Sequence, residues 1–164
     1  MIRYRPIATP LGPLFATAVG DTLTGLYYEG GRHAPQISSL WVEDLRAGPL
    51  AECARQLADY FAGRRREFEL PMAPGGTPFQ RRVWDEIRRI PYGETLSYAE
   101  LARRAGAPGS ARAAGAATGR NPLSIVVPCH RVIAIGGSLT GYAGGLERKA
   151  RLLEIEGALR AEAA

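Results

Sequence analysis

The sequence predicts an α/β N-terminal domain followed by a mostly α-helical C-terminal domain with a helix-turn-helix. Residues 14–28 alternate apolar and polar side chains around Gly20 and Asp21, which is typical of a β-hairpin with a two-residue turn. Apolar residues then recur at helical spacing over residues 50–61. Beyond residue 76, helix-capping patterns follow one another closely. Strands are therefore expected in the first half of the chain, and helices dominate the second.

A short segment between these regions is rich in residues that break regular structure. Pro71–Gly76 holds two prolines and two glycines, and such clusters are typical of linkers. We therefore expect an N-terminal domain at residues 1–72, a linker at 73–76 and a C-terminal domain at 77–164.

The composition is that of a globular protein. The chain has 164 residues, of which 46% are hydrophobic, enough for one substantial core or two small ones. No stretch reaches the roughly 18 apolar residues of a membrane span, and the first residues lack the apolar core of a signal peptide. We therefore expect a cytoplasmic protein without a membrane partner.

The chain carries a formal net charge of +5, almost wholly from arginine, since Lys149 is its only lysine. A basic surface is compatible with nucleic acid as a partner. Arginine richness also follows from genomic base composition, so the charge alone does not establish DNA binding.

The thiols and imidazoles are few. Cys53 and Cys129 are the only cysteines, His33 and His130 the only histidines, and a tetrahedral zinc site would have to use all four or borrow carboxylates. We therefore expect no metal ion and no other cofactor. Cys53 lies on the apolar face of the 50–61 helix, where a buried free thiol behaves as a small hydrophobic residue.

The C-terminal region begins with three successive helix patterns. Thr77 is a good N-cap before Pro78, and the following apolar stripe comprises Phe79, Val83, Ile87 and Ile90. Ser97 and Glu100 form a capping-box pattern for a second helix, which Gly106 ends. Ser110 can cap a third helix over residues 111–119.

The second and third of these helices are joined by a tight connector. Such a pair is compatible with a helix-turn-helix DNA reader, but an ordinary αα-corner has the same spacing. The third helix favours DNA binding, because nearly all of its side chains are small and Arg112 is its only long cationic one. A slim helix of this kind suits a minor groove about 6 Å wide.

An apolar run at residues 125–133 is interrupted by Pro128, Cys129 and His130. We interpret it as a buried strand that stops to present a thiol and an imidazole. The nucleophilic form of cysteine is the thiolate, which needs a nearby base or positive field. A buried strand with an inert thiol is the alternative for Cys129 taken alone.

The motifs of the C-terminal region together resemble the O6-alkylguanine-DNA alkyltransferase family. The resemblance covers residues 77–157 with little interruption and includes TPFQ at 77–80, Arg112 and its helix, Asn121 and Pro122, PCHRV at 128–132, GYAGG at 141–145, and a last helix that ends at Glu156 and Gly157. The start TPLGPL at residues 9–14 is also similar to that family. The resemblance implies a ribonuclease-H-like N-terminal domain and a helix-turn-helix that binds DNA.

The resemblance implies DNA repair by direct reversal of damage. Such a protein flips O6-alkylguanine, and by extension O4-alkylthymine, out of duplex DNA and transfers the alkyl group to its own cysteine. Here the acceptor is Cys129. The product is a thioether that no nearby group cleaves, so each molecule acts once, as a methylated-DNA-[protein]-cysteine S-methyltransferase.

The resemblance also assigns roles to four further residues near the acceptor. Glu156 orients His130, which deprotonates Cys129 through a water molecule, and Asn121 stabilises the turn that presents them. Tyr98 donates a proton to N3 of the departing guanine, which makes the leaving group neutral.

The remaining positions implied by the resemblance contact DNA or line the base pocket. Arg112 enters the base stack and fills the gap left by the flipped nucleotide, which offsets part of the cost of extrusion. The other DNA-binding positions are Ser97, Ala111, Ala113 and Gly115. The pocket positions are Tyr142, Ala143, Gly144 and Val132.

The expected partner is double-stranded DNA carrying alkylated guanine, bound through its minor groove by a monomer that can bind cooperatively. Mammalian members of the family carry N-terminal zinc ligands. This sequence has no such set, so the resemblance does not imply a zinc site here. Two rival functions stay open at this point: a Cys/His thiol hydrolase, and a DNA-binding module that senses damage without alkyl transfer. The presence of Cys129 favours transfer over sensing, and the adjacency of Cys129 and His130 in the sequence disfavours a hydrolase dyad.

Overall fold

The computed structural model describes residues 1–137 and 141–158. The chain divides into two compact units. The N-terminal unit comprises Met1–Gly75 together with Pro122–Val126, and the C-terminal unit comprises Gly76–Asn121 together with the chain from Val127 onward. None of the helices in the described part of the chain is both long and apolar enough to cross a membrane.

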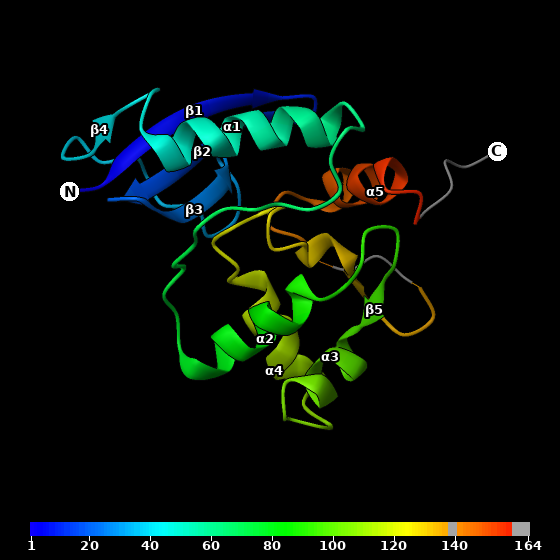
Figure 1. The fold of residues 1–164 in the computed structure, drawn as a ribbon. Helices are drawn as coiled ribbons and strands as arrows, with labels where there is room; N and C mark the ends of the chain where they lie inside the picture. The colour runs from blue at the N-terminus through cyan, green and yellow to red at the C-terminus, as the bar shows by residue number, and fades with distance from the viewer. Residues whose placement is uncertain (138–140, 159–164) are drawn as a thin grey trace. The chain divides into compact units, whose positions relative to one another are not determined.

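The N-terminal unit is built on one four-stranded sheet in the order β3-β2-β1-β4 (Figure 1). Its strands are β1 (Arg3–Thr9), β2 (Gly12–Val19), β3 (Thr22–Tyr28) and β4 (Val42–Glu43). Strands β1, β2 and β3 are antiparallel neighbours, and the short β4 runs parallel to β1. The predicted hairpin at residues 14–28 is confirmed as β2 and β3, with Gly20 at a φ of 58° in its turn.

Helix α1 (Gly48–Phe61) packs against β1 and β2, and Figure 1 shows it lying along the sheet. Its buried face includes Leu50, Cys53 and Leu57, as the apolar spacing predicted, but it ends at Tyr60 and not at Phe61, which is half-buried. Cys53 is fully buried, and burial raises the pKa of its thiol to about 12. This environment fits a packing role for Cys53.

A buried glutamine on α1 holds the chain that leaves the helix. The Gln56 amide donates to the Glu69 carbonyl, and its own carbonyl accepts from the Glu69 backbone N–H, both at 2.9 Å. We expect Gln56→Leu to lower the free energy of unfolding by about 2 kcal/mol, because two backbone groups lose their partners. Urea denaturation measures this, with the exposed neighbour Arg55→Met as a control that should change stability by less than about 1 kcal/mol. Equal losses in both variants would contradict the role of Gln56.

Residues 122–126 also belong to the N-terminal unit. Leu123 forms a parallel bridge with Leu26 of β3. The Leu26 N–H donates to the Pro122 carbonyl at 2.7 Å, and the Ser124 N–H donates to the Leu26 carbonyl at 3.0 Å. The C-terminal domain predicted over residues 77–164 includes this segment, which in the structure extends the edge of β3.

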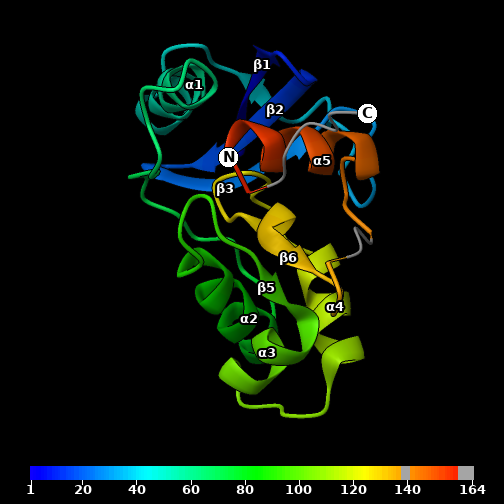
Figure 2. The same ribbon diagram turned by 90° about the vertical axis from the view of Figure 1, so that its right-hand side faces the viewer.

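The C-terminal unit contains most of the helices. They are α2 (Pro78–Arg88), α3 (Tyr98–Arg104), α4 (Ala111–Gly119), α5 (Leu146–Ile155) and the short 3₁₀ helix η1 (Cys129–Arg131). Two short parallel strands, β5 (Leu96–Ser97) and β6 (Val132–Ile133), pair beside them. Figure 2 shows α2, α3 and α4 packed together next to these strands. The Trp84 indole N–H donates to the Ala117 carbonyl at 2.8 Å and joins α2 to α4.

The predicted helix starts are largely confirmed. Thr77 and Gln80 form a reciprocal capping box at α2, and the Ser97 hydroxyl accepts from the Glu100 N–H at 3.1 Å at the start of α3. The capping-box prediction for Glu100 is wrong in its second half, because the Glu100 carboxylate accepts from the arginines one turn later, Arg103 and Arg104. Ser110 is the N-cap residue of α4, but its side chain makes no capping bond there.

The interpretation of residues 125–133 as a buried strand is wrong. The run is buried, but it forms a turn followed by η1, and only Val132 and Ile133 are extended. Ile125 adopts a φ of 71°, a conformation that β-branched residues rarely take. The chain therefore turns sharply just before the cysteine. Successive side chains alternate between two faces in a strand, but not in a turn.

Candidate active site

The thiol of Cys129 is held by an asparagine from the end of α4. The Asn121 side-chain N–H groups donate to the Val127 carbonyl at 2.9 Å and to Cys129 Sγ at 3.2 Å. The Cys129 N–H donates to the same Val127 carbonyl at 2.8 Å. Asn121 and Cys129 are both buried. One amide thus fixes the turn and supplies a hydrogen bond to the sulfur, which stabilises a thiolate more than a thiol.

The neighbouring imidazole is anchored to a buried carboxylate. His130 Nε2 lies 2.8 Å from Glu156 Oε2, and both side chains are fully buried. Arg131 donates to the same carboxylate, from Nε to Oε1 at 2.8 Å and from Nη2 to Oε2 at 3.0 Å. Its Nη1 donates to the Ile90 carbonyl at 2.7 Å, which ties this cluster to the end of α2.

These contacts determine the protonation of the cluster. Burial opposes a charge on Glu156, but hydrogen bonds and charges from His130 and Arg131 hold its pKa at about 2, so it is ionised at neutral pH. Burial lowers the pKa of His130 below its ordinary value despite the Glu156 carboxylate. A carboxylate only accepts, so neutral His130 carries its proton on Nε2 and keeps a lone pair on Nδ1.

Nδ1 of His130 is therefore the basic atom of the site. It is buried and has no hydrogen-bond partner among the described residues. Buried polar atoms are nearly always paired, so an unpaired ring nitrogen in a cluster whose other groups are paired is typical of an atom that acts on a substrate or a water molecule.

The surroundings of the Cys129 thiol act on its pKa in opposite directions. Burial raises the pKa of Cys129, while the Asn121 hydrogen bond and the charge of Lys149 lower it. The thiol is therefore protonated in the resting protein and depends on its neighbours to become a nucleophile.

Pairing of β5 with β6 brings Tyr98 to this cluster. Leu96 pairs with Val132 and Ser97 with Ile133, so α3 begins immediately beside the chain that leaves η1. The Tyr98 ring lies against α4 at Gly115, where a Cβ would be 3.7 Å from the ring. The structure thus brings Tyr98 into the same unit as the cysteine and the imidazole, although the two segments are far apart in the sequence.

Two of the predicted pocket residues lie beside this cluster: Val132 follows η1 directly, and Tyr142 contacts His130. Val132 is fully buried on β6, and the Tyr142 ring meets the His130 ring edge-on at 6.4 Å between centroids. Gly144 accepts a hydrogen bond from Arg148 at 3.3 Å, and Ala143 between them is half-buried.

Helix α4 presents the predicted DNA-binding residues on its outer face. Arg112 and Ala113 are exposed, Ala111 and Gly115 are half-buried, and Ala114 and Ala117 face the core. Within the part of the chain that the structure describes, Arg112 has no hydrogen-bond or ion-pair partner. Its guanidinium is therefore available to a ligand.

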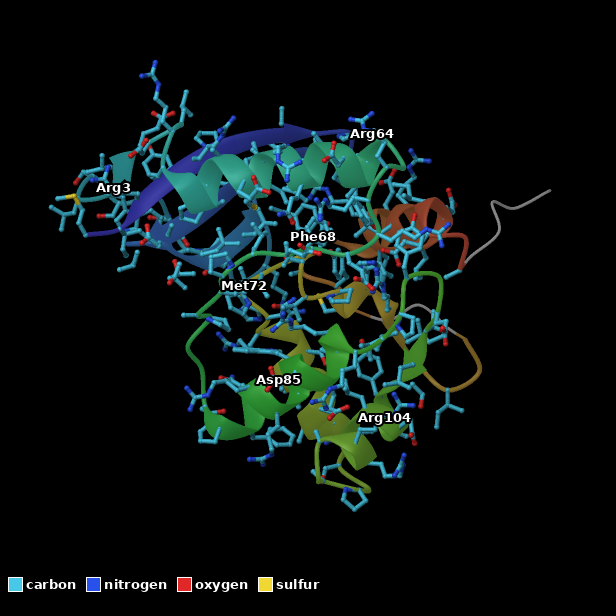
Figure 3. The ribbon with its side chains drawn as sticks, viewed as in Figure 1. Arg3, Arg64, Phe68, Met72, Asp85 and Arg104 are labelled. Carbon is cyan, nitrogen blue, oxygen red and sulfur yellow. The ribbon has the colours of Figure 1, made fainter. Side chains whose placement is uncertain are left out.

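Several arginines at α2 and α3, among them Arg82, Arg89 and Arg104, are instead engaged within the protein. A groove of about 580 Å³ at α2 and the end of α3 is lined by Arg82, Asp85, Glu86, Arg89, Arg104, Ala105 and Gly106, and Figure 3 labels Asp85 on α2 and Arg104 at α3. Arg89 pairs with Glu86, and Arg104 with Glu100. Arg89 and Arg104 of the groove are thus in ion pairs, whereas Arg112 of α4 has no ion-pair partner among the described residues.

Two residues of the cluster were missed by the sequence analysis. Arg131 was part of the PCHRV motif, and its charge within an apolar run was the signal that it would need a buried partner. Lys149 shares one face of α5 with Leu152 and Leu153, and a lysine at a core position of a helix is the corresponding signal. Both side chains are buried.

Two family descriptions match the two halves of the chain. "6-O-methylguanine DNA methyltransferase, ribonuclease-like domain" matches residues 2–74, and "6-O-methylguanine DNA methyltransferase, DNA binding domain" matches residues 78–158. The fold class predicted from the sequence, a sheet-containing N-terminal domain followed by a helical DNA-binding domain, is confirmed by these matches and by the structure.

Curated relatives and solved structures agree with this match. The methylated-DNA-protein-cysteine methyltransferase of Mycobacterium tuberculosis is 48% identical over 156 residues, covering 95% of this chain and 93% of its own. The constitutive enzyme of that name from Bacillus subtilis is 45% identical, covering 93% and 94%. A crystal structure of M. tuberculosis OGT in complex with DNA is similar at a TM-score of 0.86 and 46% identity, covering 95% and 93%.

Proposed function

This chain belongs to the 6-O-methylguanine DNA methyltransferase family, and we propose that it repairs alkylated DNA by moving the alkyl group of O6-alkylguanine onto its own Cys129. The observation that carries the proposal is the buried cluster in which Asn121 donates to the Cys129 sulfur while Glu156 holds His130 with Nδ1 unpaired. This arrangement supplies a nucleophile, its base and the group that orients the base.

The first step is ionisation of the thiol. A water molecule between Cys129 and His130 passes the thiol proton to Nδ1, and the imidazolium that forms is stabilised by the Glu156 carboxylate. The Asn121 N–H then donates to the thiolate. Because the carboxylate is already ionised and oriented, little reorganisation is needed.

The second step is an in-line displacement. Cys129 Sγ attacks the alkyl carbon, a carbon–sulfur bond forms, and the bond from that carbon to O6 breaks with its electrons passing to guanine. The Tyr98 hydroxyl gives a proton to guanine N3, so guanine leaves as a neutral base. O4-alkylthymine presents the same alkyl–oxygen bond and is a second substrate.

The product explains the stoichiometry. A thioether has no good leaving group, so Cys129 stays alkylated and each molecule acts once. The acceptor must also remain reduced before use, which a cytoplasmic location provides.

DNA binding is assigned to α4 and the start of α3. The small outer residues of α4 allow close approach to the minor groove, with Ser97 at the start of α3 beside them. Arg112 enters the stack as the damaged nucleotide is extruded into the pocket formed by Val132, Tyr142, Ala143 and Gly144. The protein binds as a monomer and can bind cooperatively along DNA.

Intact mass spectrometry with a duplex that carries one O6-methylguanine tests the proposed function. We expect one added methyl group, mapped to Cys129 and complete at one equivalent of DNA, and no added mass on Cys129→Ser. Unchanged mass with retained DNA binding would replace the proposal with a damage-sensing module. Turnover of a carbonyl substrate without a stable adduct would favour a thiol hydrolase.

A further inference from the structure

Lys149 is the one lysine of the chain, and its side chain is fully buried on the inner face of α5. Placing an ammonium group in a protein interior costs free energy unless hydrogen bonds and charges compensate. The steps proposed above for Cys129, His130, Glu156 and Tyr98 do not use this group. Its contacts therefore indicate what it does.

The Lys149 ammonium joins three segments around the acceptor site. Nζ donates to the Val132 carbonyl of β6 at 2.6 Å and to the Gly141 carbonyl at 3.4 Å. It also lies 5.9 Å from the centroid of the Tyr98 ring at the start of α3. The first two contacts link β6 to the beginning of the loop that carries Tyr142.

The ammonium is also near enough to Cys129 for each group's charge to act on the other. Burial lowers the pKa of Lys149 to about 8, and the charge of Cys129 opposes that shift. In return, the charge of Lys149 lowers the pKa of Cys129. The other titratable groups that face it are His130 on η1, whose pKa its charge also lowers, and Tyr98 on α3.

We propose that Lys149 is a positioning residue of the acceptor site, whose buried ammonium ties the pocket wall at Val132 to the loop at Gly141 and stabilises the Cys129 thiolate before alkyl transfer. The inference rests on the proposed function for its role in repair. The charge also disfavours the imidazolium form of His130, so the decisive quantity is the ionisation of the thiol itself, measured without a guanine substrate.

The test compares Lys149→Met with the parent protein. Methionine keeps an apolar stem of similar length and removes the charge. The rate of Cys129 carbamidomethylation by iodoacetamide is followed by mass spectrometry from pH 6 to 10, and O6-benzylguanine labelling is followed over the same range. We expect Lys149→Met to move both profiles to higher pH, with about a tenfold lower rate at pH 7 and a smaller loss above pH 9.

Two internal controls accompany this comparison. Arg151→Met removes a cation from the exposed face of the same helix and should leave the profile in place. Cys53, with its pKa of about 12, should remain unmodified in folded protein and reports unfolding of a variant. An unshifted iodoacetamide profile in folded Lys149→Met would overturn the proposal.

A second measurement does not require the lysine variant to fold. Protein labelled only in lysine gives a single side-chain signal, from which the pKa of Lys149 is read by NMR. We expect a lower pKa in Cys129→Ser than in the parent, because serine cannot supply the thiolate charge. Equal values would contradict the pairing of ammonium and thiolate.

The two proposals can fail separately. If the parent protein does not accept a methyl group from DNA but the thiol profile still depends on Lys149, the proposed function fails and the ionic pairing stands. If methyl transfer is complete and the iodoacetamide profile is independent of Lys149, the function stands and the inference fails.

Discussion

Replacing Glu156 by glutamine is expected to slow alkyl transfer to Cys129 by about 100-fold or more at pH 7. Glutamine has nearly the same shape, but it carries no charge and has one accepting oxygen where the carboxylate has two, so it cannot serve both His130 and Arg131 as Glu156 does. The imidazolium that His130 forms on taking the proton then lacks a stabilising negative charge, so the base is weakened while the packing is retained.

The loss of transfer rate in Glu156→Gln should vary with pH, but it should be the same for a duplex DNA substrate and for a free base. Burial raises the pKa of the Cys129 thiol, but once the pH is high enough for the thiol to ionise without a base, the rates of Glu156→Gln and parent protein should converge. Because the defect lies in the chemistry, duplex O6-methylguanine and free O6-benzylguanine should be affected equally. Single-turnover rates measure both, with Glu154→Gln on the same helix as the control. Unaltered rates in Glu156→Gln would exclude His130 as the base held by this carboxylate.

The same substitution should reduce stability. Arg131 donates two hydrogen bonds to Glu156 in a buried setting, and weakening such a pair costs about 3 kcal/mol. The lowered pKa of Glu156, about 2 against an ordinary 4.5, makes this stabilisation complete above pH 4.5 and progressively lost as the pH falls toward 2. The gap in unfolding free energy between parent and variant should therefore narrow over that range.

Arg112→Ala is expected to weaken repair of duplex DNA by about 10- to 100-fold while reaction with free O6-benzylguanine is unchanged. Extrusion of a nucleotide costs a few kcal/mol, and a side chain that fills the gap offsets part of that cost. The free base needs no extrusion. Arg112 is exposed on α4 and its guanidinium has no partner among the described residues, so it is the group on this helix that we expect to enter the stack.

A matched surface variant separates this role from general attraction to DNA. Arg88→Ala removes an exposed arginine from α2 and should weaken duplex binding only through charge, with little effect on the rate at saturating DNA. A mispaired lesion is easier to extrude and should lessen the defect of Arg112→Ala. Equal losses with duplex and free base would refute the role of Arg112 in flipping.

Local sequence signals predicted the helices well because their determinants lie within each segment. The apolar spacing of α1, the Thr77 cap of α2 and the bounds of α4 follow from residues within one or two turns. The β2–β3 hairpin is equally local, since a glycine turn sets its register. Strands β1, β4 and β5 were not predicted, and of the strand predicted over residues 125–133 only β6 is extended, because the partners of these strands are distant or the strands are only a few residues long.

The sequence by itself determined the family and the fold class, and its PCHRV motif led to the proposal that Cys129 is the acceptor and His130 its base. Only the tertiary structure decided that the apolar run before Cys129 is a turn, that Glu156 is shared between His130 and Arg131, and that Lys149 lies near the thiol. These features depend on contacts between segments far apart in the chain, because the charge of a buried group is set by neighbours that folding alone brings together.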